Sequence, residues 1–324
     1  MGSPVIVQIE DIYYPVLAAI GVPVNLVAIV ILSRGNCGLS KCITVYLVGM
    51  AVADLLVIIT DPIFYWIVSI YIPDSFLRIT PVCSLIIVLL NAATVVSVWL
   101  TVTFTFDRFV AICCEKLKTK YCTEKTAAVV VGTVSVLGCL QSLPWYFTLE
   151  QYYFFNNVPM GCVHKPSFFT SPTWGAFELF HLILTPCAPV FLILLLNVLT
   201  ARRILSASKV RRLYRGHSNG ENHKDPEMEN RRKSIILLFT ISGSFILLWV
   251  TRVVHNIYAR IADIQLYHSY TDPVYITQQT SNMLQLLSSC TNTCIYAVTQ
   301  SKFRQDLKLV VKYPFNLIVK LVKS

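Results

Sequence analysis

The sequence predicts an all-α membrane protein, a bundle of seven transmembrane helices followed by a short amphipathic helix. Composition is the first reason: hydrophobic residues make up 55% of the 324 residues and charged residues only 14%, whereas soluble domains carry about 25% charged residues. The second reason is that seven segments reach the roughly 20 mostly apolar residues that span a bilayer. Because no linker-like segment divides the chain, we expect a single domain over residues 1–324.

The bounds of the predicted spans follow the apolar runs. The spans are Tyr13–Leu32, Ile43–Ile70, Val82–Ile112, Ala127–Phe147, Trp174–Leu199, Ser234–Ile257 and Pro273–Val298. They are predicted as helices because barrel strands would show apolar and polar residues in alternation over about ten residues. The seven helices therefore fall within residues 13–298 and leave residues 1–12 as an N-terminal segment.

The distribution of basic residues predicts how the bundle sits in the membrane. With residues 1–12 outside, the inner loops and tail hold 22 of the 27 Lys and Arg residues, and the outer loops hold Arg78, Lys165 and, near a helix end, Arg260. Because cytoplasmic loops are enriched in Lys and Arg, we expect a multi-pass plasma-membrane protein with an extracellular N-terminus and a cytoplasmic C-terminus. This topology accounts for the net charge of +10, so the expected surroundings are a lipid bilayer and nucleic acid is not an expected partner.

Two inner segments differ from the spans. Residues 206–232 are polar and rich in Gly, Asn, Glu and Lys, which predicts a flexible third cytoplasmic loop. Residues 301–324 predict an interfacial helix and a cytoplasmic tail, because lysines lie opposite an apolar helical face formed by Phe303, Leu307 and Val310 or Val311. A disordered basic tail is the alternative, and the regular spacing up to Pro314 disfavours it.

Ionisable side chains inside the spans need a reason, because each costs about 2.5–3.5 kcal/mol on insertion scales. The spans contain Asp54, Asp107, Arg108, Glu178, His181, Arg252 and His255, and also the amides Asn25, Asn91, Asn197, Asn256, Asn282 and Asn292. Hydrogen bonding between helices is a sufficient reason for an amide or a hydroxyl. It is a weaker explanation for full charges, which therefore indicate functional sites.

The order and spacing of short motifs resemble those of rhodopsin-like G-protein-coupled receptors over essentially the whole chain. The motifs are Asn25, Asp54 in LVGMAVADLL, Cys83, Asp107-Arg108-Phe109, Pro186, Phe245 and Trp249 in FILLW, Asn292 and Tyr296 in NTCIY, and Phe303. Within this class, three segments resemble the orphan receptors described as sensing aromatic amino acids such as tryptophan and phenylalanine. These are YYPVLAAIGVPVNLVAIVILS, FILLWVTR and SNMLQLLSSCTNTCIY.

The resemblance implies a receptor that binds a small extracellular ligand, an aromatic amino acid or a short peptide. It also implies activation of a heterotrimeric G protein, of the Gq or Gi class, by outward movement of the sixth helix. A chemosensory receptor of the same fold is the alternative; a secondary transporter is less favoured because the sequence shows no inverted repeat. We expect no enzyme, because the six His residues are scattered and no HExxH or GxSxG motif occurs.

The resemblance also assigns a switch, made of Asp107, Arg108, Phe245, Trp249, Asn292 and Tyr296. Arg108 would meet the G protein, and Asp107 would hold its guanidinium inward in the resting state. The sixth span begins Arg231-Arg232-Lys233, so no acid faces Arg108 at the usual spacing. A weak resting lock and high basal signalling are therefore expected.

Two structural sites are expected near the third span. Cys83 and Cys162 both fall on the oxidising outer face, where a disulfide would join them. Within the bundle, the resemblance implies an allosteric sodium ion, the one cofactor expected, held by Asp54, Ser97 and Asn292. The competing interpretation is a protonated Asp54 hydrogen-bonded to Asn25 and Asn292, because burial disfavours a charged carboxylate.

The expected ligand pocket lies in the outer half of the bundle. By position it includes Asn91, Thr94, Glu178, Trp249, Arg252, Asn256, Asn282 and Gln285. Leu90 and Leu286 stand where amine receptors carry an Asp and opsins carry the retinal lysine, so neither ligand is expected. Two interpretations of Arg252 stay open: a packing salt bridge to Glu178, or a bidentate site for a ligand carboxylate with Glu178 meeting the ligand's ammonium group.

Overall fold

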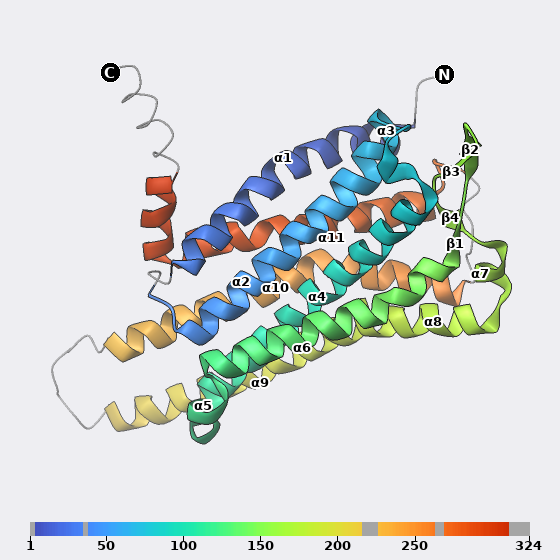
Figure 1. The fold of residues 1–324 in the computed structure, drawn as a ribbon. Coiled ribbons are helices and arrows are strands. Elements are labelled where there is room, and N and C mark those ends of the chain that lie inside the picture. Colours follow the sequence, from blue (N-terminus) through green and yellow to red (C-terminus); the bar gives the residue numbers. More distant parts are fainter. Residues whose placement is uncertain (1–3, 35–37, 216–225, 263–268, 311–324) are drawn as a thin grey trace, which may run out of the picture.

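The computed structural model describes residues 4–34, 38–215, 226–262 and 269–310. It confirms the predicted seven-helix bundle (Figure 1). The helices are α1 (Val5–Ser33), α2 (Lys41–Ile58), α3 (Val68–Tyr71), α4 (Thr80–Cys113), α5 (Glu115–Tyr121), α6 (Glu124–Ser142), α7 (Pro166–Thr170), α8 (Pro172–Leu182), α9 (Ala188–Arg215), α10 (Pro226–Ile261) and α11 (Pro273–Thr299). Two short 3₁₀ segments, η2 (Phe76–Arg78) and η3 (Leu143–Thr148), lead into α4 and end the fourth span.

Two spans contain a π-helical segment at a proline. The second span runs from α2 through η1 (Ile59–Ile67) to α3, and the fifth from α8 through η4 (Ile183–Cys187) to α9. Pro62 and Pro186 lie inside these segments. A proline has no N–H to donate to the preceding turn, and a widened π turn is one way to accommodate it. Both segments bring side chains into the outer half of the bundle.

Six helical spans among the described residues are long and apolar enough to cross a membrane, and α11 does not reach that hydropathy. It carries a run of amides and hydroxyls that includes Gln279, Asn282, Gln285 and Asn292. Its neighbours in the bundle are α10, α1 and α2. Polar side chains are tolerated at membrane depth where they face other helices instead of lipid, so the packing permits a crossing that hydropathy alone misses.

Three predicted boundaries are wrong because helices continue past their apolar runs. The first helix begins at Val5 instead of Tyr13, and it includes Glu10, which is only 3% exposed. The predicted loop 206–232 is helical over 206–215 and 226–232, at the ends of α9 and α10; residues 216–225 lie outside the described residues. Lys, Arg and Glu are good helix formers, so charge marks the edge of the lipid and not the end of a helix.

The bundle has two dissimilar ends (Figure 1). One end, called the outer end here, carries four short strands that an all-α prediction omits: β1 (Leu149–Glu150), β2 (Tyr153–Phe155), β3 (Val158–Met160) and β4 (Val163–His164). β2 and β3 form a hairpin, and β1 pairs with β4. The hairpin turn is made by Asn156 and Asn157, both with positive φ (50° and 61°), which suits a type I′ turn.

The opposite, inner end carries a helix over residues 301–310, as predicted. Phe303 is fully buried and its ring lies 5.9 Å from that of Tyr296. Leu307 and Val310 pack against the same core, which also holds Tyr46 and Phe104. The predicted apolar face therefore docks onto the bundle, while residues 311–324 of the predicted tail lie outside the described residues.

Candidate ligand cavity and switch network

The outer half of the bundle contains an open cavity of about 670 Å³, a size typical of small-molecule sites. Its wall includes the eight predicted pocket residues, Asn91, Thr94, Glu178, Trp249, Arg252, Asn256, Asn282 and Gln285. Trp66 from η1 also lines it, as do His164 and Phe168 from the segment between α6 and α8, called the outer loop here. The structure therefore gathers around one cavity side chains that lie far apart in the sequence.

The charged groups of the cavity pair differently from the predicted packing bridge. Arg252 donates through Nη1 to the side-chain oxygen of Asn282, and Asn282 donates in turn to Gln279 at 3.0 Å. Glu178 lies 3.8 Å from Arg260, and both side chains are about half exposed, at 53% and 49%. Arg260 lies two helical turns outward of Arg252 on α10, so it meets the Glu178 carboxylate at the cavity mouth.

Sequence reasoning missed Asp61 as a site residue. The π segment η1 places it on the cavity wall, where its carboxylate lies within electrostatic range of the Arg252 guanidinium. His181 and His255 also line the cavity, and both lie within electrostatic range of Arg252. The sequence did carry a signal for this site, because Asp61 is an ionisable residue inside an apolar span, one residue before Pro62.

Trp249 links the cavity to the middle of the bundle. Its indole N–H donates to the Ser288 hydroxyl at 3.1 Å, and its ring stacks on Phe245 with centroids 5.2 Å apart. Both rings pack with Val98, Val102, Val190 and Ile193 in one buried cluster. Trp99 packs against the same cluster, and its indole N–H donates at 3.2 Å to the Leu184 carbonyl in the π segment η4.

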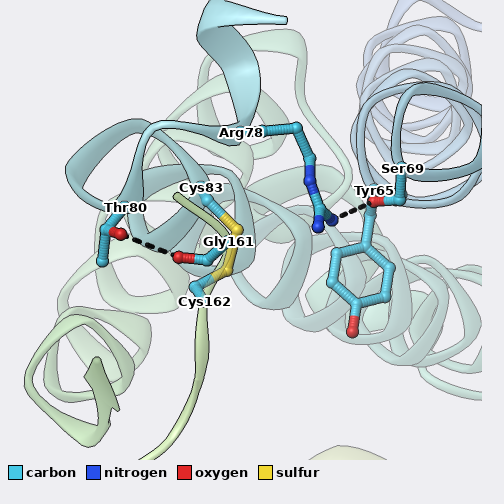
Figure 2. Close-up of a disulfide and its surroundings, with 7 residues drawn as sticks. All are labelled: Tyr65, Ser69, Arg78, Thr80, Cys83, Gly161 and Cys162. Carbon is cyan, nitrogen blue, oxygen red and sulfur yellow. Dashed lines mark hydrogen bonds between the residues drawn. A yellow bond between two sulfur atoms is a disulfide. The ribbon is translucent and has the colours of Figure 1, made fainter. Parts of the chain in front are cut away.

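The predicted disulfide between Cys83 and Cys162 is confirmed, and it ties the outer loop to the start of α4 (Figure 2). Around it, Thr80 donates to the Gly161 carbonyl at 2.8 Å, and the Gly161 N–H donates to the Arg78 carbonyl at 2.7 Å. The Arg78 guanidinium donates at 2.6 Å to Ser69 on α3 (Figure 2). Gly161 has φ +71°, which a side chain would strain.

The outer loop folds back over the cavity through an aromatic cluster. His164 stacks on Phe168 with ring centroids 4.3 Å apart, and its ring lies 5.9 Å from that of Trp145. Burial lowers the pKa of His164 below its usual value of 6.5, because an apolar setting disfavours the charged imidazolium. The cluster therefore holds a neutral histidine beside the cavity.

At the middle of the bundle, donors from two helices meet the Asp54 carboxylate. Ser97 donates to one oxygen at 2.6 Å and Asn292 to the other at 2.8 Å. Of the two bonds in the competing interpretation, the one from Asn292 is present, whereas Asn25 donates to the Gly21 and Ser289 carbonyls. The carboxylate, the hydroxyl and the amide oxygen are hard oxygen ligands of the kind that alkali and alkaline-earth cations take, so the residues fit the implied sodium ion.

At the inner end, Asp107 and Arg108 form a buried ion pair, exposed by 0% and 5%. Arg108 donates through Nε at 2.9 Å and through Nη2 to the same carboxylate oxygen. The other oxygen accepts from the Cys42 thiol at 3.3 Å. From α10, Ser234 meets Arg108 at 3.4 Å. A neutral hydroxyl thus stands at this helix contact, in keeping with the missing acid.

Tyr296 and Asn292, the remaining predicted switch residues, lie on one helix but in separate environments. Tyr296 is fully buried in the inner core against Phe303, while Asn292 bonds to Asp54. The predicted switch residues therefore fall into separate groups: Phe245 with Trp249, Asn292 with Asp54, Tyr296 in the inner core, and Asp107 with Arg108.

Comparisons with known proteins agree with this architecture. The G-protein coupled receptor 15 of Mus musculus is 24% identical over 306 residues, which cover 91% of this chain and 77% of that receptor. The Probable G-protein coupled receptor 142 of Mus musculus is 24% identical over 322 residues, 94% of this chain and 73% of that protein. Neuropeptide receptor 22 of Caenorhabditis elegans is 29% identical over 138 residues, 42% of this chain and 32% of that receptor.

The family model described as 7 transmembrane receptor (rhodopsin family) matches residues 24–296. This stretch runs from the first helix to Tyr296 and includes the cavity residues other than Tyr14, the Asp54 cluster and the Asp107–Arg108 pair. The match therefore covers the elements that form these three candidate sites. On this match and on the seven-helix bundle, the chain belongs to the rhodopsin family of seven-transmembrane receptors.

Proposed function

We propose that this receptor binds a small zwitterionic ligand in the outer cavity, an aromatic amino acid or a short peptide, and activates a heterotrimeric G protein at its inner end. The observation that carries the proposal is a cavity of about 670 Å³ that holds Arg252 and Asp61 together beside aromatic walls. The N-terminus would be extracellular and the C-terminus cytoplasmic, as the basic inner loops favour. The similarity to Neuropeptide receptor 22 is a further reason to include peptides among the candidates.

The two ends of the ligand would meet opposite charges. The Arg252 guanidinium would take the carboxylate, because its fork of donors matches a carboxylate in bidentate geometry. Asp61 would take the ammonium group, since its carboxylate lies in range of Arg252 and Glu178 already pairs with Arg260. The ligand's ring would lie against Trp66 or Trp249, as aromatic rings favour offset or edge contacts.

Ligand contact with Trp249 would bias the inner end. Trp249 and Phe245 stack on α10, and a shift of this helix would separate Ser234 from Arg108. The inner end would then open a groove for the terminal helix of a G protein, of the Gq or Gi class. A sodium ion at Asp54, Ser97 and Asn292 would favour the resting arrangement by tying two helices together.

The Arg108–Ser234 contact supports high basal signalling. The Ser234 hydroxyl offers Arg108 neither a second charge nor the bidentate geometry of a carboxylate, so the closed state would be held weakly. Cells that express the receptor should show G-protein activity above an empty-vector control without added ligand. Equal activity in the two cell lines would refute this part of the proposal.

The ligand class is tested by exposing receptor-expressing cells to single amino acids and short peptides while calcium and cAMP are recorded. Aromatic amino acids, or peptides containing them, should give the strongest responses. Asp61→Asn should weaken the response to a free amino acid more than Glu178→Gln does, because Glu178 pairs with Arg260. A receptor that answers to no zwitterion, or that prefers ligands lacking a carboxylate, would contradict the proposal.

A further inference from the structure

We propose that the ligand is a dipeptide of two aromatic residues with tyrosine at its C-terminus, and that the outer loop and α8 bind the tyrosine ring. The inference rests on the proposed function and selects one class of ligand from those named there. The part of the cavity that would hold the tyrosine ring is called the phenol subsite here. It is lined by Trp145, His164, Phe168 and His181.

Two separate groups of aromatic rings line the cavity. Trp66 stacks on Tyr14 of α1 with ring centroids 4.6 Å apart, and both belong to one hydrophobic cluster. Trp145 and Phe168 belong to a different cluster. A free aromatic amino acid carries a single ring, so it can occupy only one of these groups. A ligand that uses both needs two rings, and a cavity of about 670 Å³ is of the size that holds such larger ligands.

Trp145 is the centre of the phenol subsite. Its ring centroid lies 5.9 Å from that of Phe168 and 5.3 Å from that of His181. The side chain is only 9% exposed, and its buried indole N–H finds no acceptor among the described residues. Because an unpaired buried donor destabilises the structure that contains it, a ligand that supplies an acceptor at this point gains affinity.

His164 carries the complementary unpaired atom. Its ring centroid lies 5.9 Å from that of Trp145. The ring hydrogen-bonds the backbone of Thr148, while Nδ1 is buried and has no partner in the part of the chain that the structure describes. In a neutral imidazole one nitrogen carries the proton and the other accepts, so Nδ1 is left as an acceptor. A donor and an acceptor therefore stand unpaired in neighbouring rings.

A phenol hydroxyl matches this pair of atoms, because it can accept one hydrogen bond and donate another. Its oxygen would accept from the Trp145 N–H, and its O–H would donate to Nδ1 of His164. A phenyl ring would leave both atoms unpaired, and a site built to bind a hydroxyl rejects the analogue that lacks it. Both atoms are shielded from solvent in this arrangement, so the outer loop would shift to admit the hydroxyl, as loops do in a substantial minority of complexes.

The charged groups of the cavity decide the order of the two residues. His181 belongs to the phenol subsite and lies within electrostatic range of Arg252, so the residue that carries the carboxylate would place its ring there. Tyr14, which stacks on Trp66, lies within electrostatic range of Asp61. The residue that carries the ammonium group would therefore place its ring against Trp66. Tyrosine is thus the C-terminal residue.

The test measures how three dipeptides, Phe-Tyr, Tyr-Phe and Phe-Phe, bind to the full-length receptor in nanodiscs. Affinity is read from the rise in melting temperature with peptide concentration. Phe-Tyr should bind about tenfold more tightly than Phe-Phe, roughly the factor that hydrogen bonds of ordinary net strength give. Tyr-Phe has the same composition and charge in the reverse order, so it should bind as weakly as Phe-Phe. Equal affinity of Phe-Tyr and either other peptide would overturn the proposal.

Substitutions in the subsite check which groups read the hydroxyl. Trp145→Phe keeps a ring but removes the N–H, so it should abolish the preference for Phe-Tyr over Phe-Phe. His164→Phe removes the acceptor and should reduce the same preference, which keeps the test decisive if Trp145→Phe does not fold. Trp174→Phe is the matched control, because Trp174 packs against the same cluster but is not one of the described residues that line the cavity. A preference that survives both subsite variants would overturn the proposal.

The outcomes separate this inference from the proposed function. If all three peptides bind equally and Arg252→Ala weakens each of them, the zwitterion site stands and the phenol subsite is refuted. If the receptor binds none of the peptides and no free aromatic amino acid, the proposed function fails and this inference fails with it.

Discussion

The outer and inner halves of the bundle use polar residues in opposite ways. In the outer half, Asp61, Arg252 and Glu178 line an open cavity. In the inner half, Asp107 and Arg108 are almost fully buried and paired with each other, next to a packed core of Tyr46, Phe104 and Tyr296. One set of helices therefore provides a recognition surface at one end and a closed contact at the other.

This difference indicates where substitutions should affect function and where they should affect stability. Polar groups that face a cavity exchange hydrogen bonds with water or a ligand, so losing one changes binding more than folding. Groups in a packed core lose contacts that nothing replaces. The predictions below use this contrast, in order of decreasing effect.

Phe303→Ala should be the most damaging single change at the inner end. The ring is fully buried against Tyr296, and truncating a buried Phe typically costs about 3–5 kcal/mol. The melting temperature of purified receptor should fall sharply. Leu309→Ala on the same helix is the control, because Leu309 is 66% exposed; equal losses from the two variants would argue against docking of this helix.

Replacing both Cys83 and Cys162 by Ser should destabilise the outer end. The bridge closes a loop with a sequence separation of 79 residues, and losing a disulfide typically costs about 2–4 kcal/mol. Surface expression and ligand response should both drop. Cys139→Ser removes an exposed free thiol and should have little effect; an unchanged double variant would show that the outer loop holds its place without the bridge.

Arg252→Ala should reduce agonist potency while the fold survives. A hydrogen bond to a charged group contributes about 1.5–3 kcal/mol, so the concentration for half-maximal response should rise about tenfold to a hundredfold. Melting curves and dose–response curves, measured on the same preparations, check both halves of this statement. Unchanged potency would remove Arg252 from the ligand site and leave its bond to Asn282 as a packing feature.

Acid should weaken the outer loop through His164. Its pKa in the folded protein lies below 6.5, so the unfolded state binds a proton first as pH falls, and the favourable contribution present above about pH 6.5 is then lost. The melting temperature should decline modestly between pH 7.5 and 5.5. His164→Phe should reduce this decline, and a variant with the wild-type pH profile would assign the effect to another group.

Several features of the fold and of the sites could be predicted from sequence. The apolar runs, the basic loops and the motif order predict seven helices, the Cys83–Cys162 bridge and the eight residues now seen on the cavity wall. Boundaries were less accurate: α1 begins at Val5, and α9 and α10 extend into the predicted loop. Hydropathy reports transfer into lipid, whereas helix ends depend on backbone hydrogen bonds that charged residues also support.

The sequence by itself determined the class of the protein, because a chain with so many long apolar runs and so few charges must cross a bilayer as helices. Tertiary structure alone decided which charges meet. The π segment at Pro62 brings Asp61 near Arg252, Glu178 pairs with Arg260, and Ser234 is placed beside Arg108. Such pairings depend on the rotation and depth of each helix, which packing sets and which the spacing of residues along a single helix does not specify.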